Sequence, residues 1–77
     1  MSHVPHELHE EFPSQHDRIM KLKEEDAHFG RLYDEYHEIN RAIHRAETDV
    51  EPTDDTHMTE MRKQRMRLKD EIARILS

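Results

Sequence analysis

Two apolar stripes on either side of a proline constrain the fold of this chain more than any other feature. The first has residues spaced alternately three and four apart: Phe29, Leu32, Tyr36, Ile39, Ile43, Ala46 and Val50. The second repeats this spacing after Pro52, with Met58, Met61, Arg65, Leu68, Ile72 and Ile75. Such spacing keeps the side chains on one face of an α-helix, and no alternating apolar pattern indicates a strand.

The second stripe matches the first in reverse order. Facing residues in an antiparallel pair of helices have position numbers that add to a constant, and the two stripes satisfy this to within one residue. Tyr36 then faces Ile72, and Ile43 faces Arg65. We therefore predict an all-α fold, an antiparallel hairpin of two long helices at about 27–50 and 55–76, with Asp55 as the N-cap of the second.

The residues before the hairpin are predicted to form a shorter helical segment. Ser14 and Asp17 have the spacing of a capping box, which indicates a helix start. Asp26 is a good N-cap residue at a point where the apolar phase resets, so we expect a break there. This divides the chain into a flexible His-rich leader, residues 1–12, and a single helical hairpin domain, residues 13–77.

The composition leaves little material for a core. Of the 77 residues, 32% are hydrophobic and 39% are charged, and there is no cysteine for a disulfide or a thiolate zinc site. Oligomerisation is the remaining way to stabilise so small a domain, and we expect a homodimeric four-helix bundle. The alternative is a monomeric hairpin with the N-terminal segment folded over it. Phe29 has no partner in the hairpin, so either Ile19 and Leu22 or another subunit should cover it.

The stretch RKQRMRLKDEI, residues 62–72, raises the question of nucleic-acid binding. Residues 61–77 carry six Lys and Arg against two Asp and Glu, whereas residues 1–60 carry six against 16. The bases surround a helix instead of forming one flat patch, and no aromatic residue among them is placed to stack on a base. We expect them to pair with Asp34, Glu35, Glu38 and Glu47 of the facing helix. RNA or polyanion binding is the alternative, through Arg62, Lys63, Arg67 and Lys69.

Arg65 and the histidines are the other polar residues of interest. Arg65 occupies a seam position, from which its guanidinium can reach Asn40, His44 or Glu47. The eight histidines include three carboxylate-x-x-His pairs, about the number expected by chance among 18 carboxylates. We therefore predict no built metal site and no cofactor, although His3, His6 and His9 form a trio that suits weak Zn²⁺ or Ni²⁺ binding.

No motif in the sequence indicates catalysis. There is no Gly-rich phosphate loop and no nucleophile with a supporting triad, and a thin helical seam offers no concave substrate pocket. The longest apolar run is two residues, which is too short for a membrane span or a signal-peptide core. We expect a cytoplasmic protein that is not an enzyme.

Most of the chain also resembles a known family. The stretches FPSQHDRIMKLKEEDAHFGRLYDEYHEINRAI and MRKQRMRLKDEIARIL resemble the YdcH-like family, small bacterial proteins classed as a domain of unknown function. The resemblance covers residues 12–77 and depends on Phe12-Pro13, Leu22-Lys23, Phe29 with Leu32, Lys63-Gln64-Arg65 and Leu68-Lys69-Asp70-Glu71. It implies an α-helical hairpin in a bacterial cytoplasm, without an established activity or site residues. The leader lies outside the family's usual span, and Ala27 stands where relatives can have a proline.

The sequence thus predicts a noncatalytic helical interaction module. We expect it to self-associate through the apolar seam, with a dimer favoured, and to bind a protein partner that the sequence does not identify. Nucleic acid is a less favoured partner, and no membrane is expected. The seam consists of Phe29, Leu32, Tyr36, Ile39, Ile43, Ala46, Val50, Met58, Met61, Arg65, Leu68, Ile72 and Ile75.

Overall fold

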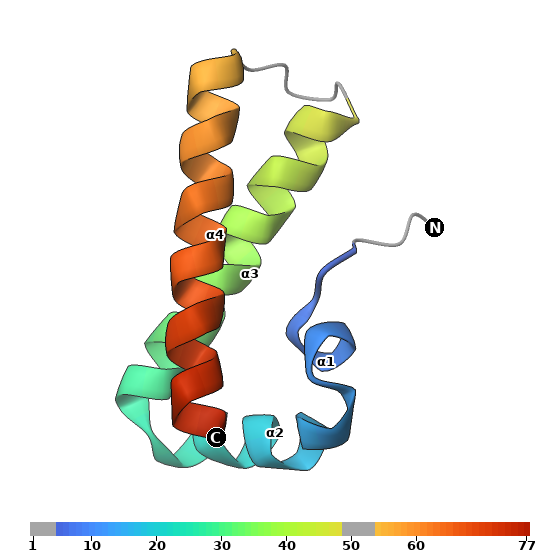
Figure 1. Cartoon of the computed structure of the whole chain (residues 1–77). Helices are drawn as coiled ribbons and strands as arrows, with labels where there is room; N and C mark the ends of the chain where they lie inside the picture. Colours follow the sequence, from blue (N-terminus) through green and yellow to red (C-terminus); the bar gives the residue numbers. More distant parts are fainter. Residues whose placement is uncertain (1–4, 49–53) are drawn as a thin grey trace.

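The predicted all-α fold is confirmed by the structure, a computed structural model that describes residues 5–48 and 54–77 (Figure 1). Five helical elements follow one another along the described chain, and no strand occurs among these residues. The elements are α1 (Leu8–Glu11), the 3₁₀ turn η1 (Pro13–Gln15), α2 (His16–Glu25), α3 (Ala27–Glu47) and α4 (Asp55–Leu76).

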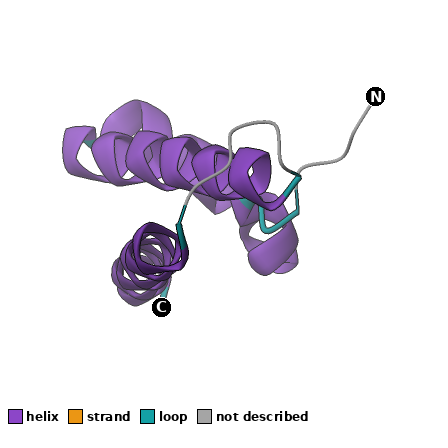
Figure 2. Cartoon of the chain, turned by 90° about the horizontal axis from the view of Figure 1, so that it is seen from above, coloured by secondary structure: helices purple, strands orange, loops and turns teal. Residues whose placement is uncertain are grey.

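Helices α3 and α4 form the predicted antiparallel hairpin. They pack against each other and cross obliquely, since Figure 2 shows α4 nearly end-on while α3 beside it is seen from the side. Tyr36 and Ile72, which the sequence places opposite each other, are both fully buried in one cluster. Helix α3 ends at Glu47, a few residues before the predicted end near 50. Val50 and Pro52 lie outside the described residues.

The caps of the helices are partly those that the sequence indicates. Asp26 breaks the chain between α2 and α3, and its side chain accepts hydrogen bonds from the backbone N–H groups of His28 and Phe29. The N-cap of α4 is Asp54, whose carboxylate accepts from the His57 N–H at 2.7 Å, so the prediction of Asp55 was wrong by one residue. The predicted capping box at Ser14 was also wrong, because η1 occupies Pro13–Gln15 and α2 begins at His16.

Helix α2 crosses the open end of the hairpin, beneath the C-terminus of α4 (Figure 1). Its Ile19 is buried in the same cluster as Phe29, and Leu22 packs against that cluster. The segment before the hairpin therefore covers Phe29 within one chain, which was one of the two arrangements expected. Arg18 adds a long hydrogen bond, 3.4 Å, from its guanidinium to the Ile75 carbonyl of α4.

The main core cluster lies where α1, α2, α3 and α4 meet. It consists of Leu8, Ile19, Phe29, Leu32, Tyr36, Leu68, Ile72 and Leu76. Leu8 is 1% exposed although the sequence assigned it to a flexible leader, because the described part of that leader, residues 5–12, folds back onto the hairpin. A helix this short is unstable without tertiary contacts, so its formation depends on the packing of Leu8 against the hairpin.

A second, smaller cluster lies nearer the loop end of the hairpin. Its buried members are Ile43, Ala46 and Met61, and Ile39, Ala42 and Met58 pack around them while remaining partly exposed. Only α3 and α4 contribute to this small core cluster. Among the described residues, the core is therefore larger at the end where α1 and α2 pack than at the loop end.

Candidate functional site

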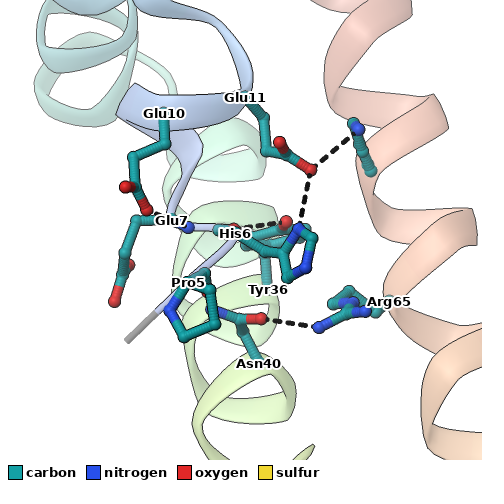
Figure 3. A network of polar contacts seen from close by, with 9 residues as sticks. Pro5, His6, Glu7, Glu10, Glu11, Tyr36, Asn40 and Arg65 are labelled. Carbon is teal, nitrogen blue, oxygen red and sulfur yellow. Dashed lines mark hydrogen bonds and ion pairs between the residues drawn. The ribbon is translucent and has the colours of Figure 1, made fainter. Parts of the chain in front are cut away.

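A network of polar contacts joins the N-terminal residues to the hairpin (Figure 3). We call residues 5–11 the N-terminal strap. Asn40, the one buried polar side chain in the described part of the chain, donates a hydrogen bond of 2.8 Å to the Pro5 carbonyl. Its own amide oxygen accepts a hydrogen bond of 2.9 Å from the guanidinium of Arg65. Asn40 therefore links the strap to both long helices, and its burial is compensated because both ends of the amide are paired.

Tyr36 makes the second contact with the strap backbone. Its hydroxyl donates a hydrogen bond of 2.6 Å to the His6 carbonyl. Burial raises the pKa of Tyr36 to about 12, and the nearby carboxylates of Glu11 and Glu7 contribute to the rise. His6 itself has a φ of 65°, which is uncommon for residues other than glycine and marks a turn at the start of the strap.

Two strap carboxylates complete the contacts. Glu11 accepts a hydrogen bond of 2.9 Å from the Lys69 ammonium of α4, and this contact lowers the pKa of the Glu11 carboxyl. Glu7 lies 2.5 Å from Nδ1 of His37 on α3. Burial lowers the pKa of His37, and the positive charges of Arg41 and Lys23 lower it further against the opposing effect of Glu7. The buried Nε2 of His37 has no hydrogen-bond partner among the described residues.

The strap network uses residues that the sequence indicated only in part. Arg65 lies in the seam and contacts Asn40, one of the three partners expected for it. Asn40 itself was not predicted as a buried residue, because a stripe of apolar positions selects Ile39 and treats the adjacent amide as solvent-facing. The spacing of residues in the sequence does not predict the hydrogen bond from Asn40 to the Pro5 carbonyl, because the two residues are 35 positions apart.

The basic stretch of α4 is divided by the fold. Arg62 pairs with Glu47 at 2.9 Å, as expected, and Lys69 pairs with Glu11 of the strap. Lys63 and Arg67 are exposed and make no ion pair within the described part of the chain. The four candidate anion-binding residues therefore do not form one free basic patch.

An open groove is lined by residues of both α3 and α4, and none of these residues makes one of the polar contacts with the strap described above. It has a volume of about 330 Å³ and is lined by Glu35, Glu38, Ile39, Ala42 and Gln64. Ile39 and Ala42 belong to the rim of the small core cluster, so the groove exposes part of the apolar seam. Glu35 and Glu38 make no ion pair within residues 5–48 and 54–77. We call this feature the loop-end groove.

A second groove runs along the outer side of α3 and has a volume of about 580 Å³. The Lys23 ammonium lies 4.4 Å from the centre of the Tyr33 ring, and the Tyr33 and His37 rings are 4.3 Å apart. Three basic and two acidic side chains line this groove, so their charges partly offset one another. Its lining residues are Lys23, Tyr33, Asp34, His37, Glu38, Arg41 and Arg45.

The three carboxylate-x-x-His pairs are Glu25 with His28, Asp34 with His37 and Asp54 with His57, and among the described residues none of the three histidine rings forms a hydrogen bond or ion pair with the carboxylate of its own pair. His28 lies 3.6 Å from Glu71 of α4, His37 contacts Glu7, and the backbone of His57 caps on Asp54. Of the N-terminal trio, His3 lies outside the described residues, His6 contacts Glu11 at 3.4 Å, and His9 faces the ring of His16. Over the described ranges, no group of three or more metal-ligating side chains is placed to hold an ion.

None of the helices that the structure describes combines the length and the apolar content needed to span a membrane.

Comparisons with known proteins give a family without a named activity. A family model described as "Protein of unknown function (DUF465)" matches residues 29–76. The uncharacterized protein YdcH of Escherichia coli (strain K12) is 34% identical over 65 residues, which cover 84% of this chain and 88% of that protein. The uncharacterized protein YdcH of Shigella flexneri matches to the same extent. No solved structure matches the chain.

Proposed function

We propose that the chain, which belongs to the DUF465 family of proteins of unknown function, is a noncatalytic helical interaction module that pairs with a second copy of itself. Because the family description names no activity, the surface of the chain is the guide to its role. The relatives come from bacteria, and we place the module in the bacterial cytoplasm. At one end of the hairpin, α1 and α2 cover the apolar seam within the same chain. The surface that remains for pairing is the loop-end groove.

The observation that carries this proposal is the thin cover over the loop end of the hairpin. Among the residues that the structure describes, the small core cluster buries three, and Ile39, Ala42 and Met58 around it stay partly exposed. A second hairpin laid across the groove would bury Ile39 and Ala42, which line it, and each of them contributes roughly 1 to 3 kcal/mol when fully removed from water. Two-fold pairing uses the same face on both copies, which makes the surface its own partner.

The charges beside the groove support this choice of occupant. Glu35 and Glu38 lie on its α3 side, while Lys63 and Arg67 flank Gln64 on α4, and none of the four has an ion-pair partner within the described chain. In a two-fold pair, the acidic side of one copy faces the basic side of the other. Opposite charges then meet twice, which favours this arrangement over other partners of equal apolar content.

Light scattering on the purified chain tests the proposal. We expect the mass of two chains for the native sequence and of one chain for either Glu35→Lys/Glu38→Lys or Lys63→Glu/Arg67→Glu. Each charge-reversed pair faces like charges in its own dimer, whereas a mixture of the two variants restores opposite charges and should restore a dimer. All four positions are exposed, so the variants keep the hairpin. A native chain that stays monomeric at high micromolar concentration would contradict the proposal.

RNA or polyanion binding has less support. Two of its four candidate residues, Arg62 and Lys69, are engaged in ion pairs, which leaves Lys63 and Arg67. Replacing both by Gln should abolish any binding of a single-stranded RNA probe, and that binding should weaken steeply as salt is added. Binding that ignores salt would remove this second candidate.

A further inference from the structure

The N-terminal strap contacts the hairpin as a short peptide contacts a receptor. Its backbone carbonyls at Pro5 and His6 accept hydrogen bonds from Asn40 and Tyr36. Its Leu8 side chain, 1% exposed, fills an apolar site in the main core cluster. Backbone hydrogen bonds that give affinity, together with one buried apolar anchor that gives specificity, are the usual features of peptide recognition.

The strap has little structure of its own. Helix α1 is four residues long, and a helix of this length is unstable in water without tertiary contacts. The hairpin side of the contact is different, because Tyr36, Asn40 and Lys69 project from two long helices. These receptor residues all lie within the segment that matches the family model, residues 29–76, whereas the strap lies outside it.

We propose that the surface beneath the strap is a docking site for a short acidic segment of a partner protein, and that the strap is its intramolecular occupant. We call this surface the strap groove. Its recognition chemistry follows from what the strap presents: two consecutive backbone carbonyls, a leucine, and carboxylates one residue before and three residues after it.

An acidic partner suits the charges that the groove provides. Lys69 donates a hydrogen bond to the Glu11 carboxylate, and the guanidinium of Arg65 donates one to Asn40 beside the strap. At the other side, His37 contacts Glu7 in surroundings made more positive by Arg41 and Lys23. A segment with carboxylates at these positions is favoured over a neutral or basic one.

The strap is tethered, so it competes strongly with any partner. A tethered segment has an effective concentration in the millimolar range, and a separate peptide must overcome this to bind. The partner therefore binds well only when the strap is displaced or weakened. This makes the strap an inhibitor of the site that it covers.

A synthetic peptide with the sequence of residues 5–12, PHELHEEF, tests the proposal on the full-length chain. Leu8→Ala removes the anchor of the strap and leaves a site that the leucine of the peptide can fill. We expect the peptide to bind the Leu8→Ala chain at least tenfold more tightly than the native chain in a fluorescence anisotropy titration. It should also raise the melting temperature of the variant. The same peptide with alanine in place of leucine should do neither.

Matched lysine variants test the contribution of charge. Adding Lys69→Gln to the Leu8→Ala chain should weaken peptide binding several-fold, because the peptide then loses its partner for the second carboxylate. Adding Lys21→Gln should leave binding unchanged, since Lys21 is exposed on α2 and makes no ion pair within the described part of the chain. Equal losses from both lysine variants would show nonspecific attraction and would overturn the proposal.

A second variant protects the test against misfolding. If Leu8→Ala loses its helical circular dichroism, Glu7→Gln/Glu11→Gln weakens the strap without opening the core. It should bind the peptide more tightly than the native chain does. Absence of saturable binding to a folded strap variant overturns the proposal, as does equal affinity for the native chain.

The strap groove and the loop-end groove use different residues, so we expect the strap site to be independent of self-association. A dimer formed through the loop-end groove should therefore persist when the peptide is added. A native dimer that dissociates on addition of the peptide would instead assign the strap groove to a second copy of this chain. That result would overturn the proposal of a separate partner, and light scattering with and without the peptide distinguishes the two cases.

Discussion

At the scale of single residues, Tyr36 combines complete burial with a hydrogen bond to the strap. Burial disfavours the phenolate, which is why the pKa of Tyr36 is raised to about 12 from 10. Between these two pH values, an unfolded chain loses a proton that the folded chain retains. The free energy of unfolding should therefore fall as the pH rises from 10 to 12, and the loss approaches roughly 2 kcal/mol at the upper end.

Tyrosinate absorbance measures this prediction directly. The chain has two tyrosines, so Tyr33→Phe leaves Tyr36 as its single chromophore of this kind. We expect tyrosinate to appear only near pH 12 and together with the loss of helical circular dichroism. Tyr36→Phe serves as the control, because it should weaken the dependence of unfolding on pH in this range. Ionisation near pH 10 in a fully helical protein would contradict the burial argument.

Asn40 shows what residue patterns omit. It is 1% exposed, as deeply buried as the apolar seam, yet the sequence gives it no apolar character. A buried amide is tolerated only where hydrogen bonds satisfy its polar atoms. The partners of Asn40 are the Pro5 carbonyl, far away in the sequence, and the Arg65 guanidinium on α4. Arg65 could be placed in the seam from its spacing alone. The Pro5 contact could not, because it depends on how the strap folds back.

At the scale of helices, the N-cap of α4 gives a sharp test. Asp54 accepts the His57 N–H, whereas Asp55 is the first residue of the helix. Asp54→Ala should cost about 1 kcal/mol in the free energy of unfolding, because a backbone donor loses its partner. Asp55→Ala should cost less than half of this, since it removes only a favourable charge near the helix start. Urea denaturation followed by circular dichroism compares the two, and a larger cost for Asp55→Ala would contradict the assignment.

The long helices were predictable because their periodicity extends over many residues. Spacing of three and four placed α3 and α4 within a few residues of their observed bounds, and the phase reset located the break at Asp26. The shorter elements were less predictable. The capping box of α1 uses Glu7 and Glu10, and a pair of glutamates spaced this way is common in so acidic a chain. Ser14 with Asp17 matches the usual capping box more closely, but Ser14 lies within the 3₁₀ turn η1 and caps no helix.

At the scale of the whole molecule, the two core clusters differ in thickness. The main core cluster buries eight residues from four helices, while the small core cluster buries three from two. The hairpin was predictable from sequence, as was the covering of Phe29 by α2 or a second subunit. The choice between them was not, because it depends on the energy of packing and not on pattern. The burial of Leu8 in the main core cluster favours the arrangement in which Phe29 is covered within one chain.

Hydrogen exchange should reveal this difference in thickness. In dilute solution, where self-association is negligible, amides in residues 42–46 and 58–61 should exchange at least tenfold faster than those in residues 32–36 and 68–72. Regions with few buried contacts open at lower free energy than the rest of the fold. Equal protection at both ends would show that the hairpin opens only as a unit. Higher protein concentration should slow exchange at the loop end alone, if copies pair there.

The order of the core residues along the chain has a consequence for biosynthesis. Five of the eight residues of the main core cluster, namely Leu8, Ile19, Phe29, Leu32 and Tyr36, precede the loop. They emerge from the ribosome before any part of α4 emerges, and N-terminal units generally fold first during translation. The nascent chain can therefore gather strap, α2 and the start of α3 into a partial core. The last helix then arrives at a template that is already assembled.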